Sequence, residues 1–124
     1  MGTATAKMDK LASVRILPYF PRISKEQFGH EVFVTSMDDR SIQIYPLTAW
    51  FEFVDNLHNG ERDDPLMQRF LMKASYNGQR AKVDGYGRTK IPRFLGKKIN
   101  LEGEMELGER EDRLVLSPKA KRGE

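Results

Sequence analysis

Cysteine is absent from the 124 residues of this chain, which excludes disulfides, thiolate metal sites and a cysteine nucleophile and fits a reducing cytosol. No apolar run approaches the length of a membrane-spanning helix, so we expect no membrane partner. Residues 1–7 lack a following apolar segment, and we interpret them as a flexible tail rather than a signal peptide. The two histidines, His30 and His58, have no carboxylates at metal-ligand spacing, so we expect no metal or other cofactor.

The sequence patterns of common catalytic sites are missing as well. No serine or threonine lies in a nucleophile elbow, and the glycine-rich stretch described below lacks the lysine–serine pattern of a P-loop. Paired carboxylates for acid–base chemistry would need a cleft, which nothing in the sequence predicts. We therefore expect a protein that is not an enzyme and has no small-molecule substrate.

Charge is abundant and unevenly distributed. Charged residues make up 31% of the chain and hydrophobic residues 39%, so a monomer would have a thin core that association could complete. Residues 69–98 contain nine cations and one acid, Asp84, a net charge of +8 in a chain whose total is +3. This concentration, together with a pI of about 9.2, favours a polyanionic partner such as nucleic acid.

A glycine turn lies within this basic segment, at residues 83–92. Gly85 and Gly87 allow positive φ and leave the backbone bare, and Asp84 can accept hydrogen bonds from N–H groups across the turn. Arg88 and Lys90 follow on a short predicted strand, two residues apart and so on one face. Such a tip suits phosphate. The alternative is a tight turn with a solvated arginine.

Hydrophobic periodicity predicts a chain with strands toward both ends and helices in the middle. The expected strands are residues 11–17, 31–35, 41–45, 80–83, a short strand from 88 that ends before Pro92, 103–108 and 112–116. The expected helices are residues 24–29, 48–57, 65–74 and 94–97. Trp50 and Phe51 lie in an apolar helix face, so we interpret them as core rather than as platforms for base stacking.

An internal repeat follows from this order of elements. Residues 39–46 parallel residues 112–118 at an offset of 73, and the strand-ending prolines Pro18 and Pro92 differ by 74. Each unit of roughly forty residues is too small to bury a core alone. The two units should therefore pack together as a pseudo-symmetric pair, with the two middle helices as connector and lid of that core.

With these features the chain resembles the MraZ family, bacterial regulators with two tandem AbrB-like β units, each marked by an Asp-x-x-Gly-Arg motif. The match is carried by Asp84-Gly85-Tyr86-Gly87-Arg88 with Ile91-Pro92, by the segment Ile44-Tyr45-Pro46-Leu47-Thr48-Ala49-Trp50, and by Gln68-Arg69-Phe70-Leu71 followed by Ala74. The resemblance implies an α+β fold of two pseudo-symmetric AbrB-like β units, swapped-hairpin or β-barrel-like, joined by two helices. Residues 8–57 would hold the first unit with a connecting helix, 58–79 the second connecting helix, 80–118 the second unit and 119–124 a charged tail.

The same resemblance implies a function. It is that of a transcriptional regulator that binds double-stranded promoter DNA through the Asp-x-x-Gly-Arg turn. Such a regulator would be a homo-oligomer, in a ring-like assembly, cytoplasmic and associated with the nucleoid. The implied DNA-binding residues are Arg88, Lys90, Asp84, Gly85, Gly87, Arg15 and Lys10. The alternative is a non-catalytic interaction or assembly module that keeps the fold without DNA readout.

The first unit departs from the family motif, because residues 9–18 contain no Gly-Arg pair. Counting back from Pro18 places Ser13 opposite Gly87 and Val14 opposite Arg88, with Arg15 one step away. A shift of one residue turns a strand side chain to the other face. Either Arg15 takes over the role through a bulge, or the first unit is purely structural.

Overall fold

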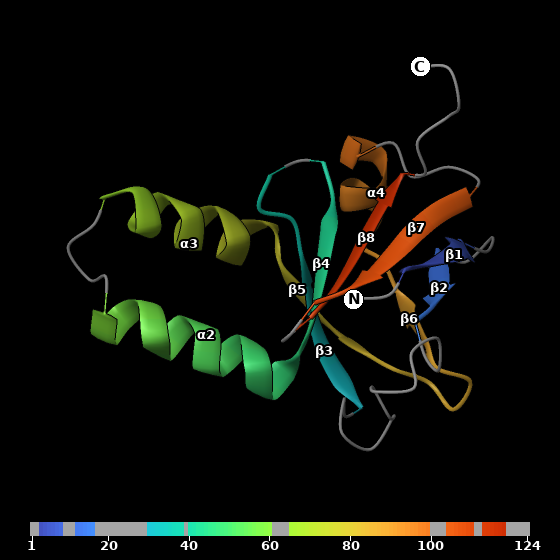
Figure 1. Ribbon diagram of the computed structural model, residues 1–124, viewed down its shortest axis with the longest axis horizontal. Coiled ribbons are helices and arrows are strands. Elements are labelled where there is room, and N and C mark those ends of the chain that lie inside the picture. The colour runs from blue at the N-terminus through green and yellow to red at the C-terminus, as the bar shows by residue number, and fades with distance from the viewer. Residues whose placement is uncertain are drawn as a thin grey trace.

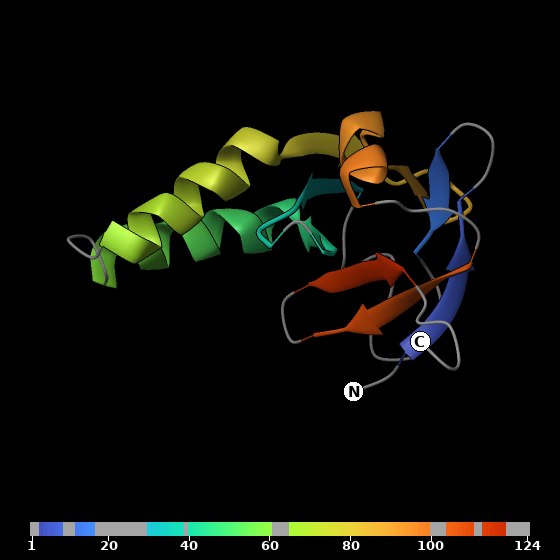
Figure 2. The ribbon, with the colours of Figure 1, turned by 90° about the horizontal axis from the view of Figure 1, so that it is seen from above.

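The computed structural model describes residues 3–8, 12–16, 30–38, 40–60, 65–99, 104–110 and 113–118. The strands are β1 (Thr3–Lys7), β2 (Ser13–Arg15), β3 (Glu31–Thr35), β4 (Ile42–Pro46), β5 (Gln79–Lys82), β6 (Arg88–Lys90), β7 (Glu104–Glu109) and β8 (Leu114–Pro118). The helices are α2 (Leu47–Gly60), α3 (Pro65–Asn77) and α4 (Arg93–Ile99). The protein is thus α+β, and α2 and α3 extend side by side away from the body of strands (Figure 1 and Figure 2).

Two hairpins build the larger sheet. β3 pairs with β4 and β7 with β8, and β4 pairs with β8 to join the hairpins, giving the strand order β1-β7-β8-β4-β3-β5 with antiparallel pairing. β2 and β6, one from each unit, form a separate two-stranded sheet. This arrangement confirms the predicted fold of two AbrB-like β units. The larger sheet is not a closed barrel, because β1 and β5 are its edges.

Both units contribute side chains to one apolar core. Period-two alternation points residues such as Val32, Val34, Ile42 and Ile44 to the face that Leu107, Leu114 and Leu116 also cover, and these side chains are fully buried. Leu95 and Ile99 attach α4 to the same core. Neither unit could bury these residues alone, which is the physical reason for the pairing.

The long helices do not cover this core, contrary to the expectation that they form its lid. They build a second apolar cluster on the other face of the β3–β4 hairpin, around Tyr45, Trp50 and Ala74. The Trp50 ring stacks on Phe33, with ring centroids 4.3 Å apart. Alternate residues of β3 and β4 thus point to opposite faces of the sheet, one set into each cluster. Trp50 is core, as predicted, whereas Phe51 is 54% exposed and the core prediction for it was wrong.

The N-terminal segment also differs from the prediction of a flexible tail. Thr3–Lys7 forms β1 along β7, in register from Thr3 opposite Gly108 to Lys7 opposite Glu104, and Ala6 is buried. Alanine and threonine give only a weak strand signal, and the ladder supplied by β7 decides the conformation. α2 and α3 each end three residues later than predicted, at Gly60 and at Asn77. The expected helix at 24–29 and the tail at 119–124 lie outside the described residues.

Candidate nucleic-acid interface

The turn between β5 and β6 is held together by Asp84. Its Oδ1 accepts the backbone N–H groups of Tyr86 at 2.8 Å and Arg88 at 2.9 Å. The backbone closes the same turn, since the Gly87 N–H donates to the Asp84 carbonyl at 3.1 Å and the Asp84 N–H donates to the Arg88 carbonyl at 2.9 Å. Four hydrogen bonds therefore fix the direction in which β6 and Arg88 leave the turn, as the sequence predicted for Asp84.

The two glycines of the turn have different roles. Gly87 adopts φ 79°, a conformation that side chains with a Cβ rarely take, so glycine is favoured there. A Cβ on Gly85 would meet no heavy atom within 4 Å, and its φ is not in the left-handed region. The prediction of positive φ is confirmed at Gly87 and wrong at Gly85.

β6 presents its cations outward. Arg88 and Lys90 are exposed, while Thr89 between them faces the interior. The Arg88 guanidinium carbon lies 5.7 Å from the centroid of the Tyr86 ring, and that ring is 76% exposed. A planar cation beside an aromatic face, on an exposed turn, can meet a phosphate or a base edge.

The first unit brings Arg15 directly beside this pair of cations. β2 runs antiparallel to β6, with Arg15 opposite Arg88 and Ser13 opposite Lys90. Directly opposed residues share a face, so Arg15 is exposed on the same side as Arg88. The described β2–β6 register is continuous, and the predicted bulge is not needed. Two like charges held opposite each other favour an anion that would lie against both. Lys10 lies outside the described residues.

Two hydrogen bonds reveal the pseudo-twofold relation between the units. The Ile16 N–H donates to the Gly87 carbonyl at 2.8 Å, and the Ile91 N–H donates to the Ala12 carbonyl at 2.9 Å. Exchanging Ile16 with Ile91 and Ala12 with Gly87 turns one bond into the other. In both exchanges the two residues are 75 positions apart in the sequence. The φ angles agree, 60° at Ala12 and 79° at Gly87.

This relation corrects the alignment of the two units made from Pro18, whose offset of 74 was one residue too small. At an offset of 75, Ser13 is the counterpart of Arg88, Arg15 is the counterpart of Lys90, and the pair Val14–Thr89 lies on the axis. The prolines misled the count because Pro92 follows Ile91 directly, whereas Leu17 separates Ile16 from Pro18. In the first unit Ala12 thus keeps the left-handed conformation of Gly87, and Ser13 stands in place of the arginine.

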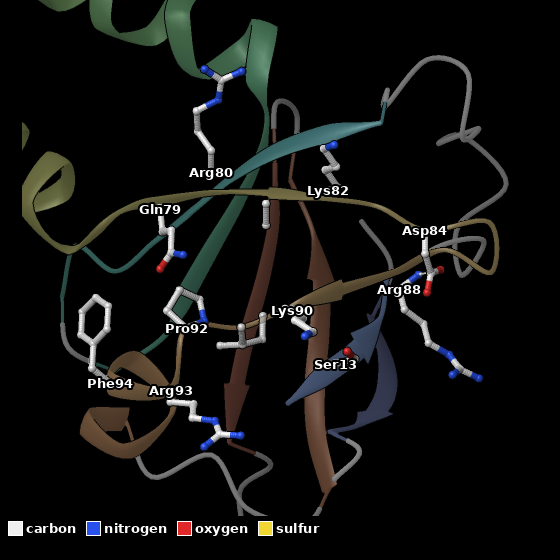
Figure 3. A pocket seen from close by; sticks show the side chains of 12 residues that line it. Ser13, Gln79, Arg80, Lys82, Asp84, Arg88, Lys90, Pro92, Arg93 and Phe94 are labelled. Atoms are coloured by element: carbon white, nitrogen blue, oxygen red, sulfur yellow. Dashed lines mark hydrogen bonds between the residues drawn. The ribbon is translucent and has the colours of Figure 1, made fainter. Parts of the chain in front are cut away.

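A hollow of about 610 Å³ lies beside the turn, between β5, β6 and the start of α4 (Figure 3). Its lining includes five cations, Arg80, Lys82, Arg88, Lys90 and Arg93, and one acid, Asp84. Sequence reasoning did not single out Lys82, Arg93 or Tyr86 as site residues. The signal available for the first two was the charge excess of residues 69–98, which does not tell which cations share a surface.

Arg80 forms an ion pair across the β3–β5 ladder. Its Nη2 lies 2.6 Å from Glu31 Oε2 on the neighbouring strand β3. The hydrogen bond and the charge of Arg80, with a smaller contribution from Lys82, hold the pKa of Glu31 below its usual value. A lowered pKa means that any stabilisation by this exposed pair is present above the ordinary carboxyl pKa and is lost as the pH falls through the folded-state value.

His30 and the acidic side chains of β7 are not part of the lining of the hollow. His30 is exposed, and no group of three potential metal ligands occurs among the described residues. Glu104 and Glu106 are exposed on β7, with Met105 and Leu107 buried on the opposite face. In the part of the chain that the structure describes, no helix is long and apolar enough to cross a membrane.

Comparison with known proteins gives consistent relatives, although no protein-family model matches the chain. It is similar to the transcriptional regulator MraZ of Acidobacterium capsulatum, with 28% identity over 104 residues, 84% of this chain and 71% of the relative. The transcriptional regulator MraZ of Koribacter versatilis is 28% identical over 105 residues, again 84% and 71% of the two chains. That of Neisseria meningitidis serogroup A is 25% identical over 116 residues, 93% and 77% of the two chains.

The paired hairpins, the β2–β6 ribbon and the Asp84 turn define a protein of two tandem AbrB-like β units. The relatives, similar over most of the chain, share one name. Over most of its length the chain is similar to curated MraZ transcriptional regulators.

Proposed function

We propose that this protein is a transcriptional regulator that binds double-stranded DNA through the outward face of the β2–β6 ribbon and has no catalytic activity. The observation that carries the proposal is the register of the ribbon, which places Arg15 opposite Arg88 on one exposed face, with Lys90 two residues from Arg88. Asp84 fixes the turn that orients Arg88. The names of the relatives support the regulatory role.

The two arginines have different proposed roles. Arg88 follows the rigid turn and reads a base edge. Arg15, which is the counterpart of Lys90 in the first unit, binds a phosphate. Arg88→Ala should then cost about 1–3 kcal/mol of binding free energy on the preferred site and relax the preference at one base position. Arg15→Ala should weaken all sequences alike and lower the salt slope by about one phosphate contact.

The test is a selection from random duplexes, followed by affinity measurements at several salt concentrations for the wild type and both variants. Arg69→Ala on α3 is the matched control, since it removes the same charge from an exposed position remote from the ribbon. Wild-type binding by a folded Arg88→Ala protein would refute the role of the turn. No salt-dependent retention of the wild type on duplex DNA would favour the alternative, an assembly module without DNA readout.

We further propose that the regulator acts as a homo-oligomer in the cytoplasm, associated with the nucleoid. One arginine-bearing turn per chain gives few DNA contacts, and linking several chains raises the overall affinity. Apolar side chains on the helical pair are exposed and available for self-association: Phe51, Leu66, Met72 and Tyr76. Light scattering coupled to size exclusion gives the molar mass, and a monomer at micromolar concentration would contradict this part of the proposal.

A further inference from the structure

The hollow beside the Asp84 turn is bordered by cations from three separate elements. Lys82 comes from β5, Lys90 from β6 and Arg93 from the first position of α4 (Figure 3). All three side chains are exposed. They are attached to well-anchored backbone, since Leu95 and Ile99 bury one face of α4 in the core and β5 is hydrogen bonded to β3.

The charged ends stand around the hollow instead of meeting in it. In Figure 3, Lys82 and Arg80 point to one side of β5, Arg93 points away on the opposite side of the hollow, and Arg88 extends beyond the turn. A single small anion could not touch such divergent groups together. A strand of nucleic acid carries a phosphate about every 3.4 Å along its axis, so it can meet several separated cations in turn.

We infer that the backbone of one DNA strand crosses this hollow, with Lys82 and Arg93 each binding a phosphate on either side of it. The inference rests on the proposed function and extends the contact surface from the ribbon onto β5 and α4. Such contacts carry no sequence information, but they fix the position and orientation in which Arg88 meets the bases.

The Glu31–Arg80 ion pair sets the limit of this surface. Arg80 lies on β5, as Lys82 does, but its guanidinium is already bound to the Glu31 carboxylate at 2.6 Å. Replacing that partner by a phosphate would bring the incoming backbone against the Glu31 carboxylate, and the repulsion between the two negative charges opposes that contact. The DNA strand therefore passes Lys82 and does not continue along β5 to Arg80.

The experiment measures log affinity against log salt for Lys82→Gln, Arg93→Gln and the double variant, on the selected duplex and on a random duplex. Each single variant should reduce the salt slope by about 0.9, and the double variant by about twice that, with the same loss on both duplexes. Arg69→Gln is the control for net charge. The double variant Glu31→Gln with Arg80→Gln is a charge-neutral control, and both controls should keep the wild-type slope.

Three results would overturn the inference. Wild-type slopes for Lys82→Gln and Arg93→Gln, while Arg88→Ala still weakens binding, would refute the backbone path and leave the proposed function standing. Absence of DNA binding by the wild-type protein would refute both the backbone path and the proposed function. Competition of ATP with duplex DNA in the wild type, lost in the double variant Lys82→Gln with Arg93→Gln, would assign the hollow to a free nucleotide instead.

Discussion

Ala12 offers a direct test of the pseudo-twofold relation, because it holds the conformation that Gly87 has in the second unit. Its φ of 60° lies in the left-handed region. A residue with a Cβ pays about 1–2 kcal/mol for that conformation, whereas glycine loses about 0.5–1 kcal/mol through its freer unfolded chain. Ala12→Gly should therefore stabilise the protein by about 0.5–1 kcal/mol, and Gly87→Ala should destabilise it by a similar amount.

The assay is urea unfolding followed by the fluorescence of Trp50 and by far-ultraviolet circular dichroism. Trp50 is the one tryptophan of the chain and is buried, so its emission reports the loss of packing. An increase of 0.5–1 kcal/mol corresponds to a rise of the melting temperature by about 2–4 °C for a domain of this size. The exchange variant, Ala12→Gly with Gly87→Ala, should return close to wild-type stability if the two sites act independently.

Ala81 on β5 supplies the control, since its φ is not positive and its strand is regular. Ala81→Gly should destabilise the protein by about 0.5–1 kcal/mol, the usual cost of glycine within a strand. If Ala12→Gly destabilises the protein as much as Ala81→Gly does, Ala12 gains nothing from glycine. The conformational equivalence of Ala12 and Gly87 would then be refuted.

Two further predictions concern packing. Thr89→Val should raise stability by about 1 kcal/mol in the same unfolding assay, because the buried Thr89 hydroxyl has no hydrogen-bond partner among the described residues and its counterpart is already Val14. A loss of stability would show that the hydroxyl is satisfied. Gly78→Ala should cost about 1–3 kcal/mol, because its Cβ would overlap the Phe33 ring, whereas Gly85→Ala, with open space around it, should be nearly neutral; equal stabilities of the two alanine variants would contradict this reasoning.

Local patterns were sufficient for much of the fold. Alternation predicted the strands of the hairpins β3–β4 and β7–β8, since a strand that covers a core must place every second side chain inside. The Asp84 turn was also predictable, because an aspartate can accept the N–H groups two and four residues further on without help from the rest of the chain. β1 was missed because its conformation depends on a distant segment: its ladder is formed with β7, about a hundred residues further along the chain.

The surface of the candidate site shows where sequence reasoning ended. The sequence determined which residues are charged and that Arg88 and Lys90 share a face. Only the tertiary structure decided that Arg15 lies opposite Arg88, that Ser13 is the counterpart of Arg88, and that Arg80 is neutralised by Glu31. These facts are set by strand register and by pairing between distant segments. A register changes by whole residues and so exchanges one set of neighbours for another, and its choice depends on the packed core of both units together.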